Sequence, residues 1–144
     1  MIDEVIQGWI TERWLAPLKG SNDPVTTLIE TCQEIMTASP SEQMACGCPL
    51  NNLTQELANN DEGFRGSLLA LFDLWRKGIA ANLERGQELG TVRRDIDLDA
   101  TGTFIVSACE GLAGTAKSTR DRKLVLSTAM VLRQFFETLR PAAT

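Results

Sequence analysis

Apolar residues recur along most of this chain every three or four positions. That spacing places side chains on one face of an α-helix, whereas a strand would alternate at every second position. Strand-like alternation is nearly absent, so the pattern predicts an all-α fold. Proline, glycine and aspartate residues divide the chain into about six helices, and we expect these to form a bundle.

Each predicted helix is bounded by residues that favour helix starts or stops. The first ends before Pro17, because proline disrupts a helix interior. The second has Asp23 as its N-cap, Pro24 at its first position and the Ser39-Pro40 pair at its end. A polar connection then leads to Pro49. The predicted spans are about 1–15, 24–38, 49–60, 61–86 with Gly86 and Gly90 at its end, a fifth helix that begins at Asp97, and 120–139.

The fourth predicted helix carries an aromatic stripe that includes Phe72, Trp75 and Ile79. Such a stripe forms either plain hydrophobic core or the wall of an apolar cavity for a small hydrophobic ligand. Cys109 is expected to face the interior of its own subunit, as structural filler or as a cavity-lining thiol. The candidate ligand-binding residues are Trp9, Met36, Phe72, Trp75, Ile79, Phe104 and Cys109.

One face of the fifth predicted helix consists of small residues, and the last helix is apolar nearly all the way round. Interior glycines cost helix stability, so a whole small-residue stripe indicates that another helix backbone comes close. Because the opposite face already supplies apolar residues for the subunit core, we expect the stripe to meet a second subunit. The candidate interface residues are Ser107, Gly111, Gly114, Ser118, Leu126, Met130, Val131 and Phe135.

Composition narrows the function classes. The 144 residues fit one domain, 1–144, and a formal net charge of −5 argues against a nucleic-acid-binding surface. No histidine is present, which excludes Ser-His-Asp and Cys-His catalysis and histidine-based metal sites. The N-terminus lacks the pattern of a signal peptide, and no apolar run is long enough to span a membrane. We therefore expect a soluble cytoplasmic protein without a cofactor, and not an enzyme.

Two short motifs invite a chemical interpretation. Cys46 and Cys48 flank a glycine at a helix start, where the helix dipole lowers thiol pKa values, so they are possible sensing thiols or else small structural residues. The run Asp95, Asp97 and Asp99 resembles the start of a calcium-binding loop. The later positions of that loop lack the glycine and the glutamate that calcium requires, so we interpret the run as a helix N-terminus and expect no metal site.

Taken in order, five segments resemble the C-terminal domain of TetR/AcrR-type bacterial transcriptional regulators: residues 47–57, 61–65, 86–90, 95–99 and 110–117. The resemblance covers essentially the whole chain. It implies a ligand-binding and dimerisation domain whose last two helices form a four-helix bundle with those of a partner. The family's N-terminal helix-turn-helix module is expected to be absent from this chain, so that DNA contact would need a module outside it.

The sequence therefore predicts the effector-binding and dimerisation domain of a TetR-type regulator, a homodimer that acts as a repressor and responds to a small apolar ligand. No membrane partner is expected. Two alternatives remain open at this point. One is a standalone interaction protein that dimerises without binding DNA, and the other is a cysteine-based sensor of electrophiles or oxidants.

Overall fold

A computed structural model describes residues 2–38 and 41–143, and every regular element in that part of the chain is helical. The predicted all-α fold is confirmed. The expected helix start at Met1 and the expected break at Ser39-Pro40 involve residues outside this part. The elements are α1 (Ile2–Ile10), the π-helix η1 (Thr11–Leu15), α2 (Ala16–Lys19), α3 (Pro24–Ala38), α4 (Ser41–Cys46), α5 (Pro49–Leu57), α6 (Glu62–Glu88), α7 (Leu98–Thr119) and α8 (Arg122–Glu137).

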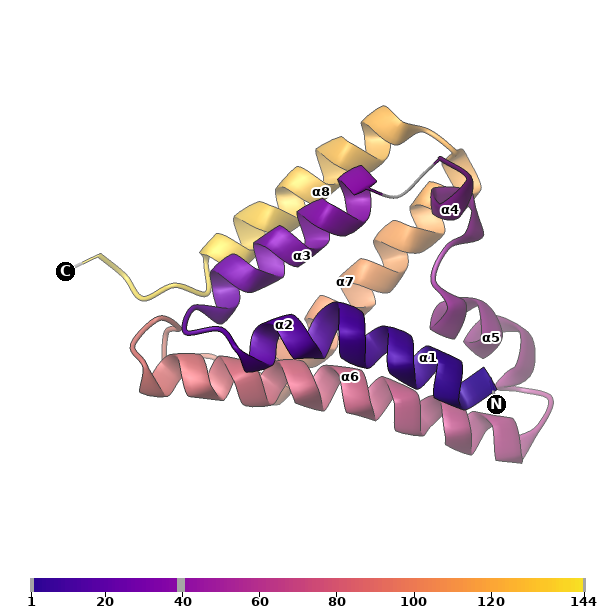
Figure 1. The fold of residues 1–144 in the computed structure, drawn as a ribbon, viewed down its shortest axis with the longest axis horizontal. Helices are drawn as coiled ribbons and strands as arrows, with labels where there is room; N and C mark the ends of the chain where they lie inside the picture. The colour runs from indigo at the N-terminus through magenta and orange to yellow at the C-terminus, as the bar shows by residue number, and fades with distance from the viewer. Residues whose placement is uncertain (1, 39–40, 144) are drawn as a thin grey trace.

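The long helix α6 is the base of the bundle. The continuous helical segment α1–η1–α2 (Ile2–Lys19), called the rod below, lies along one side of α6 (Figure 1). Helix α7 packs extensively against α6. Helices α3 and α8 lie side by side on the opposite side of the molecule, while α4 contacts α7 and α5 contacts α6. None of the helices in the described ranges combines the length and the apolar character that a bilayer crossing requires.

The first helix does not stop before Pro17, as the sequence predicted, but continues to Lys19. Pro17 has no N–H to donate to the carbonyl of Arg13, four residues earlier. The chain avoids a break by widening into one π turn, in which the N–H of Ala16 donates to the carbonyl of Thr11, five residues earlier. The rod is therefore continuous through Pro17, and the π turn locally changes the direction in which its side chains point.

Most other helices begin where the sequence predicts. The carboxylates of Asp61 and Asp97 accept hydrogen bonds from backbone N–H groups in the first turns of α6 and α7. The last helix begins one residue after Asp121, which caps it in the same way. Two details differ from the prediction. Residues 41–46, expected to be a polar connection, form the short helix α4, and Gly86 lies inside α6 rather than at its end.

The close contact between α6 and α7 depends on a residue without a side chain. A Cβ atom at Gly102 would lie 2.6 Å from the carbonyl oxygen of Arg76 and 3.3 Å from the Cβ of Ala80. Only glycine lets the two backbones approach this closely. The contact positions the whole of α7, including its buried residues Ile105 and Val106.

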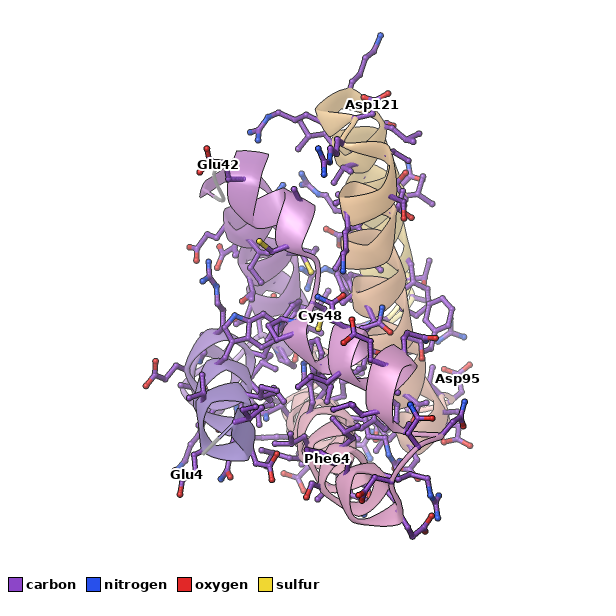
Figure 2. All side chains as sticks on the ribbon, turned by 90° about the vertical axis from the view of Figure 1, so that its right-hand side faces the viewer. Glu4, Glu42, Cys48, Phe64, Asp95 and Asp121 are labelled. Carbon is purple, nitrogen blue, oxygen red and sulfur yellow. The ribbon has the colours of Figure 1, made fainter. Side chains whose placement is uncertain are left out.

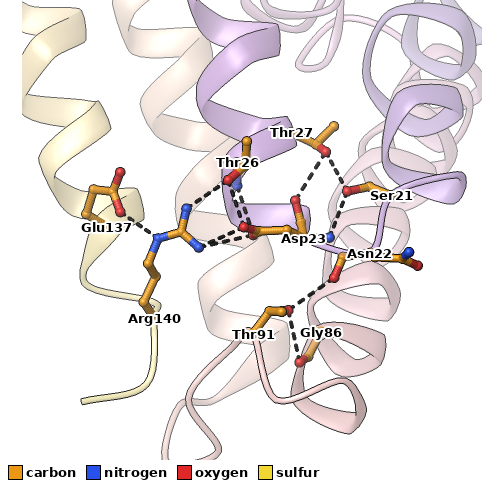
Figure 3. Close-up of polar contacts among 9 residues, drawn as sticks. All are labelled: Ser21, Asn22, Asp23, Thr26, Thr27, Gly86, Thr91, Glu137 and Arg140. Carbon is orange, nitrogen blue, oxygen red and sulfur yellow. Dashed lines mark hydrogen bonds and ion pairs between the residues drawn. The ribbon is translucent and has the colours of Figure 1, made fainter. Parts of the chain in front are cut away.

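A polar cluster fastens the C-terminal end of α8 to the start of α3 (Figure 3). The guanidinium of Arg140 donates to the carboxylate of Asp23, the hydroxyl of Thr26 and the carboxylate of Glu137. Asp23 in turn accepts from the backbone N–H of Thr26, so one carboxylate caps α3 and binds Arg140. Because α3 and α8 both border the cavity described below, this cluster fixes two of its walls.

Candidate ligand-binding cavity

A cavity of about 340 Å³ lies within the bundle. This volume is at the lower end of the range that small-molecule sites occupy. Its walls are largely apolar, and they come from eight of the helical elements and from the α4–α5 connection. The residues that line it are Trp9, Arg13, Trp14, Cys32, Ile35, Met36, Cys46, Gly47, Cys48, Pro49, Trp75, Cys109, Leu112, Ala113, Ala116 and Leu132.

All three tryptophans of the chain line the cavity, with Trp75 at the centre of the group. The rings of Trp9 and Trp75 meet edge to face, with their centroids 5.8 Å apart. Trp14 packs on Trp75 at a tilted angle, with a centroid distance of 5.1 Å. Such arrangements are favourable for aromatic pairs, and they hold three large rings in fixed positions along one wall.

The π turn explains how Trp9, Arg13 and Trp14 all reach the cavity. In a regular α-helix, Trp14 would point well away from Trp9, because five positions correspond to about 140° of rotation beyond one full turn. A π turn holds more residues per turn, which reduces that difference. The same element that accommodates Pro17 thus gives the cavity a second tryptophan and an arginine.

The remaining walls follow ordinary α-helical spacing. On α3, Cys32, Ile35 and Met36 occupy positions i, i+3 and i+4, and therefore share a face. On α7, Cys109, Leu112 and Ala116 share a face in the same way. Cys48 is buried, and Figure 2 shows it about midway between Asp121 at one end and Phe64 toward the other.

All four cysteines line this one cavity as free thiols. Cys109 has its pKa raised well above the ordinary value, first by a hydrogen bond with the Cys32 side chain, then by burial and nearby negative charge. Burial also raises the pKa of Cys48. Glu110, near both thiols, has a raised pKa because it is partly buried. In the described ranges, no three cysteine or acidic side chains are placed to hold a metal ion.

The structure brings together four of the seven candidate ligand-binding residues, namely Trp9, Met36, Trp75 and Cys109. The possible sensing thiols Cys46 and Cys48 join them. Ile79 is fully buried and Phe72 partly buried, but both pack in the core without lining the cavity.

Phe104 lies on the outside of the bundle, where it is 52% exposed and its ring centroid is 4.7 Å from that of Phe135. Phe104 precedes Ser107 by three positions and Gly111 by seven, so helical geometry places it on the small-residue face rather than on the cavity face. Its apolar character alone could not show which of the two faces it occupies.

Sequence reasoning missed several lining residues. Cys32 and Ile35 could have been found, because they share the helical face of Met36. Arg13 and Trp14 carried no such signal, since regular α-helical spacing separates Trp14 from Trp9. Leu112, Ala116 and Leu132 are apolar, but apolar spacing does not distinguish a cavity wall from a filled core.

The residues predicted to form a subunit interface lie on or near the outer face of α7 and α8. Ser107, Gly111 and Ser118 are exposed, as are Met130 and Val131. Gly114, Leu126 and Phe135 are half-buried. Apart from its chain neighbours and the nearby backbone of its own helix, a Cβ atom at Gly111 would have no atom within 4 Å, so the small size of this residue serves no contact with the rest of the chain.

The chain matches the family described as "Tetracyclin repressor-like, C-terminal domain" over residues 24–130. It is 30% identical over 96 residues to the HTH-type transcriptional repressor DhaR of Mycobacterium sp. strain GP1, an alignment that covers 67% of this chain and 47% of DhaR. It is 28% identical over 137 residues to an uncharacterized HTH-type transcriptional regulator from the lacX 3' region of Lactococcus lactis subsp. lactis, covering 95% of this chain and 68% of that protein. The chain thus spans about half the length of DhaR.

Solved structures show the same fold. A TetR-family regulator from Cytophaga hutchinsonii superposes with a TM-score of 0.82 at 16% identity, covering 98% of this chain and 70% of the other. A TetR transcriptional regulator from Chloroflexus aurantiacus J-10-FL gives a TM-score of 0.78 at 19% identity, covering 98% and 71%. Since the family match extends over most of the chain, the protein belongs to the family of tetracycline-repressor-like C-terminal domains.

Proposed function

We propose that this chain is the effector-binding and dimerisation part of a TetR-type transcriptional repressor, and that its effector is a small, largely apolar molecule. The observation that carries the proposal is the cavity of about 340 Å³ walled by all three tryptophans of the chain. Cavities of this size and lining are typical of small-molecule sites. The names of the two relatives, an HTH-type repressor and an HTH-type regulator, support the regulatory role.

Helix α7 lines the cavity on one side and forms part of the outer face on the other. A ligand in the cavity can therefore act on the outer face through the position of α7. Leu112 and Ala116 line the cavity, while Gly111 and Ser118 are exposed on the outer side. A ligand that fits one position of α7 better than another shifts the population toward that position. In the proposed mechanism this shift changes how two subunits pair, and thereby the spacing of DNA-binding modules attached to them.

The proposed partner at the outer face is a second copy of this chain. Large apolar side chains gather there beside the small residues of α7: Phe104 is 52% exposed, Val131 62% and Leu124 43%. Exposed apolar clusters of this kind mark association sites. Because α7 and α8 form a hairpin, a two-fold axis along this face would assemble four helices, two from each subunit.

Tryptophan fluorescence gives a direct test, because every tryptophan of the chain lines the cavity. We expect 1-decanol or decanoate to change the emission saturably. Ala113 lines the cavity, whereas Ala81 is an exposed residue of α6. The variant Ala113→Phe should fill the cavity and lose the response, and the control Ala81→Phe should keep it. If neither compound changes the emission saturably, the proposed effector cavity is wrong.

A further inference from the structure

Two polar groups in the cavity wall have no protein partner. Trp14 is 4% exposed and Trp75 is 1% exposed, and both line the cavity. Their indole Nε1 atoms are buried, and neither has a hydrogen-bond partner among the described residues. A buried N–H group without an acceptor is costly, and most buried polar groups in proteins are paired. Both atoms are covered by neighbouring side chains, so an acceptor on a bound molecule would satisfy either group once those side chains shift.

A positive charge lies at the edge of the same cavity. Among the described residues that line the cavity, only Arg13 is charged, and it lies in the same π-helix η1 as Trp14. Arg13 is solvent-exposed, which places it at the edge of the cavity rather than in its interior. A guanidinium has several donors in a planar fork that matches a carboxylate. Arg13 and the tryptophans together therefore offer donors, and no acceptor, to the head of a ligand.

We propose that the effector is an amphiphilic carboxylate, whose acid group binds Arg13 and the indole N–H groups of Trp14 and Trp75 while its apolar body fills the rest of the cavity. This inference rests on the proposed effector-binding function and specifies the ligand class for the same cavity. The apolar body would contact the α3, α7 and α8 walls, for which Ile35, Leu112 and Leu132 are representative.

The surrounding charges favour one orientation of the ligand in the cavity. Glu110 does not line the cavity, but its charge acts on Cys48 and Cys109, which do. A carboxylate head beside these thiols would meet a like charge, whereas beside Arg13 it meets an opposite one. A cationic head group could contact the aromatic rings, but Arg13 would repel it and the two N–H donors would offer it no acceptor. The arrangement therefore favours an anionic head at the π turn.

Three ten-carbon chains with different heads test the proposal: decanoate, 1-decanol and decylammonium, titrated at neutral pH with tryptophan emission as the readout. Charge-assisted hydrogen bonds are stronger than neutral ones, so we expect decanoate to bind on the order of tenfold more tightly than 1-decanol. Decylammonium should bind more weakly than either. Equal affinities for decanoate and 1-decanol would overturn the carboxylate proposal and leave the effector cavity intact, whereas no binding by any chain would overturn both.

Two variants locate the head group. Arg13→Gln should weaken decanoate binding about tenfold and leave 1-decanol unchanged, and Trp14→Phe should reduce the preference for decanoate while keeping an aromatic ring. Arg133→Gln, at an exposed position on α8 that does not line the cavity, is the matched control and should change neither affinity. Thermal melts of each variant show that it is folded. Unchanged decanoate binding in folded Arg13→Gln would refute the assignment of the head group.

Discussion

Arg140 Nη1 donates to both carboxylate oxygens of Asp23, at distances of 3.2 Å and 2.9 Å. The two residues are 117 positions apart in the sequence. The pair joins the end of α8 to the start of α3 (Figure 3), and neither helix carries any sequence signal for the other. Since α3 and α8 both line the cavity, the contact supports the geometry of the site as well as the stability of the fold.

We expect Arg140→Ala to lower the free energy of unfolding by about 1 kcal/mol, because it removes hydrogen bonds to Asp23, Thr26 and Glu137 from a partly exposed site. Urea unfolding followed by circular dichroism measures the change. Arg133→Ala is the control, and its effect should stay within about 0.5 kcal/mol, as for an ordinary surface substitution. Equal effects of the two variants would show that the cluster contributes nothing.

The same pair predicts a dependence of stability on pH. Burial raises the pKa of Asp23, but hydrogen bonds from Thr26 and Arg140 and the positive charge of Arg140 outweigh it and hold the pKa below its ordinary value of 3.8. A carboxylate whose pKa is lowered by folding stabilises the native state above the unfolded pKa. That contribution is lost as the pH falls below 3.8 and through the lower folded-state pKa.

Asp23→Asn should therefore be less stable than the wild type at neutral pH, and the difference should shrink as the solution is acidified below pH 3.8. Urea midpoints measured for both proteins across this range test the sign. A difference that stays constant with pH would mean that the Asp23 charge does not contribute, and that only its capping geometry does.

Two glycines of α7 should respond in opposite ways to substitution. In Gly111→Leu the new side chain has open space around its Cβ and replaces a poor helix former, so the subunit should stay folded. The bulky side chain should, however, block the proposed dimer. Gly102→Ala places a Cβ against the backbone of α6, and we expect it to destabilise the fold by about 1–3 kcal/mol. Sedimentation velocity gives the oligomeric state, and thermal melts give the stability.

The wild type must be dimeric in the same sedimentation experiment for the comparison to be meaningful. A monomeric wild type would contradict the proposed interface. So would a folded Gly111→Leu variant that remains fully dimeric.

Helix type and most helix ends were predictable because they depend on local chemistry. Helices α6 and α7 start at Asp61 and Asp97 as expected, because each carboxylate caps its helix by accepting from N–H groups two or three residues away. The π turn was not predictable, because Pro17 alone does not indicate whether a helix will stop or widen. In this chain, buried Ile10 before the turn and buried Leu18 after it both pack in the core. That tertiary packing keeps the rod continuous through the proline.

The candidate site was predictable only in part, for a related reason. Apolar periodicity identified Trp75 and Met36 as inward-facing residues, but it cannot separate a cavity wall from a filled core. Ile79, one turn after Trp75, is fully buried in the core and does not line the cavity. Which inward position borders an open space depends on how eight elements meet, and that information is not local.

The four thiols of the cavity should differ sharply in reactivity, because the thiolate is the reactive form and access is also required. Cys46 is exposed, whereas Cys48 is 4% exposed and has a raised pKa, as does Cys109. We expect iodoacetamide to alkylate Cys46 first and Cys109 last by mass spectrometry, with bound decanoate slowing the reaction at Cys46. Urea-unfolded protein, in which all four sites should react alike, is the control. Alkylation of native Cys48 or Cys109 as fast as that of Cys46 would instead favour an electrophile sensor that uses Cys48 or Cys109.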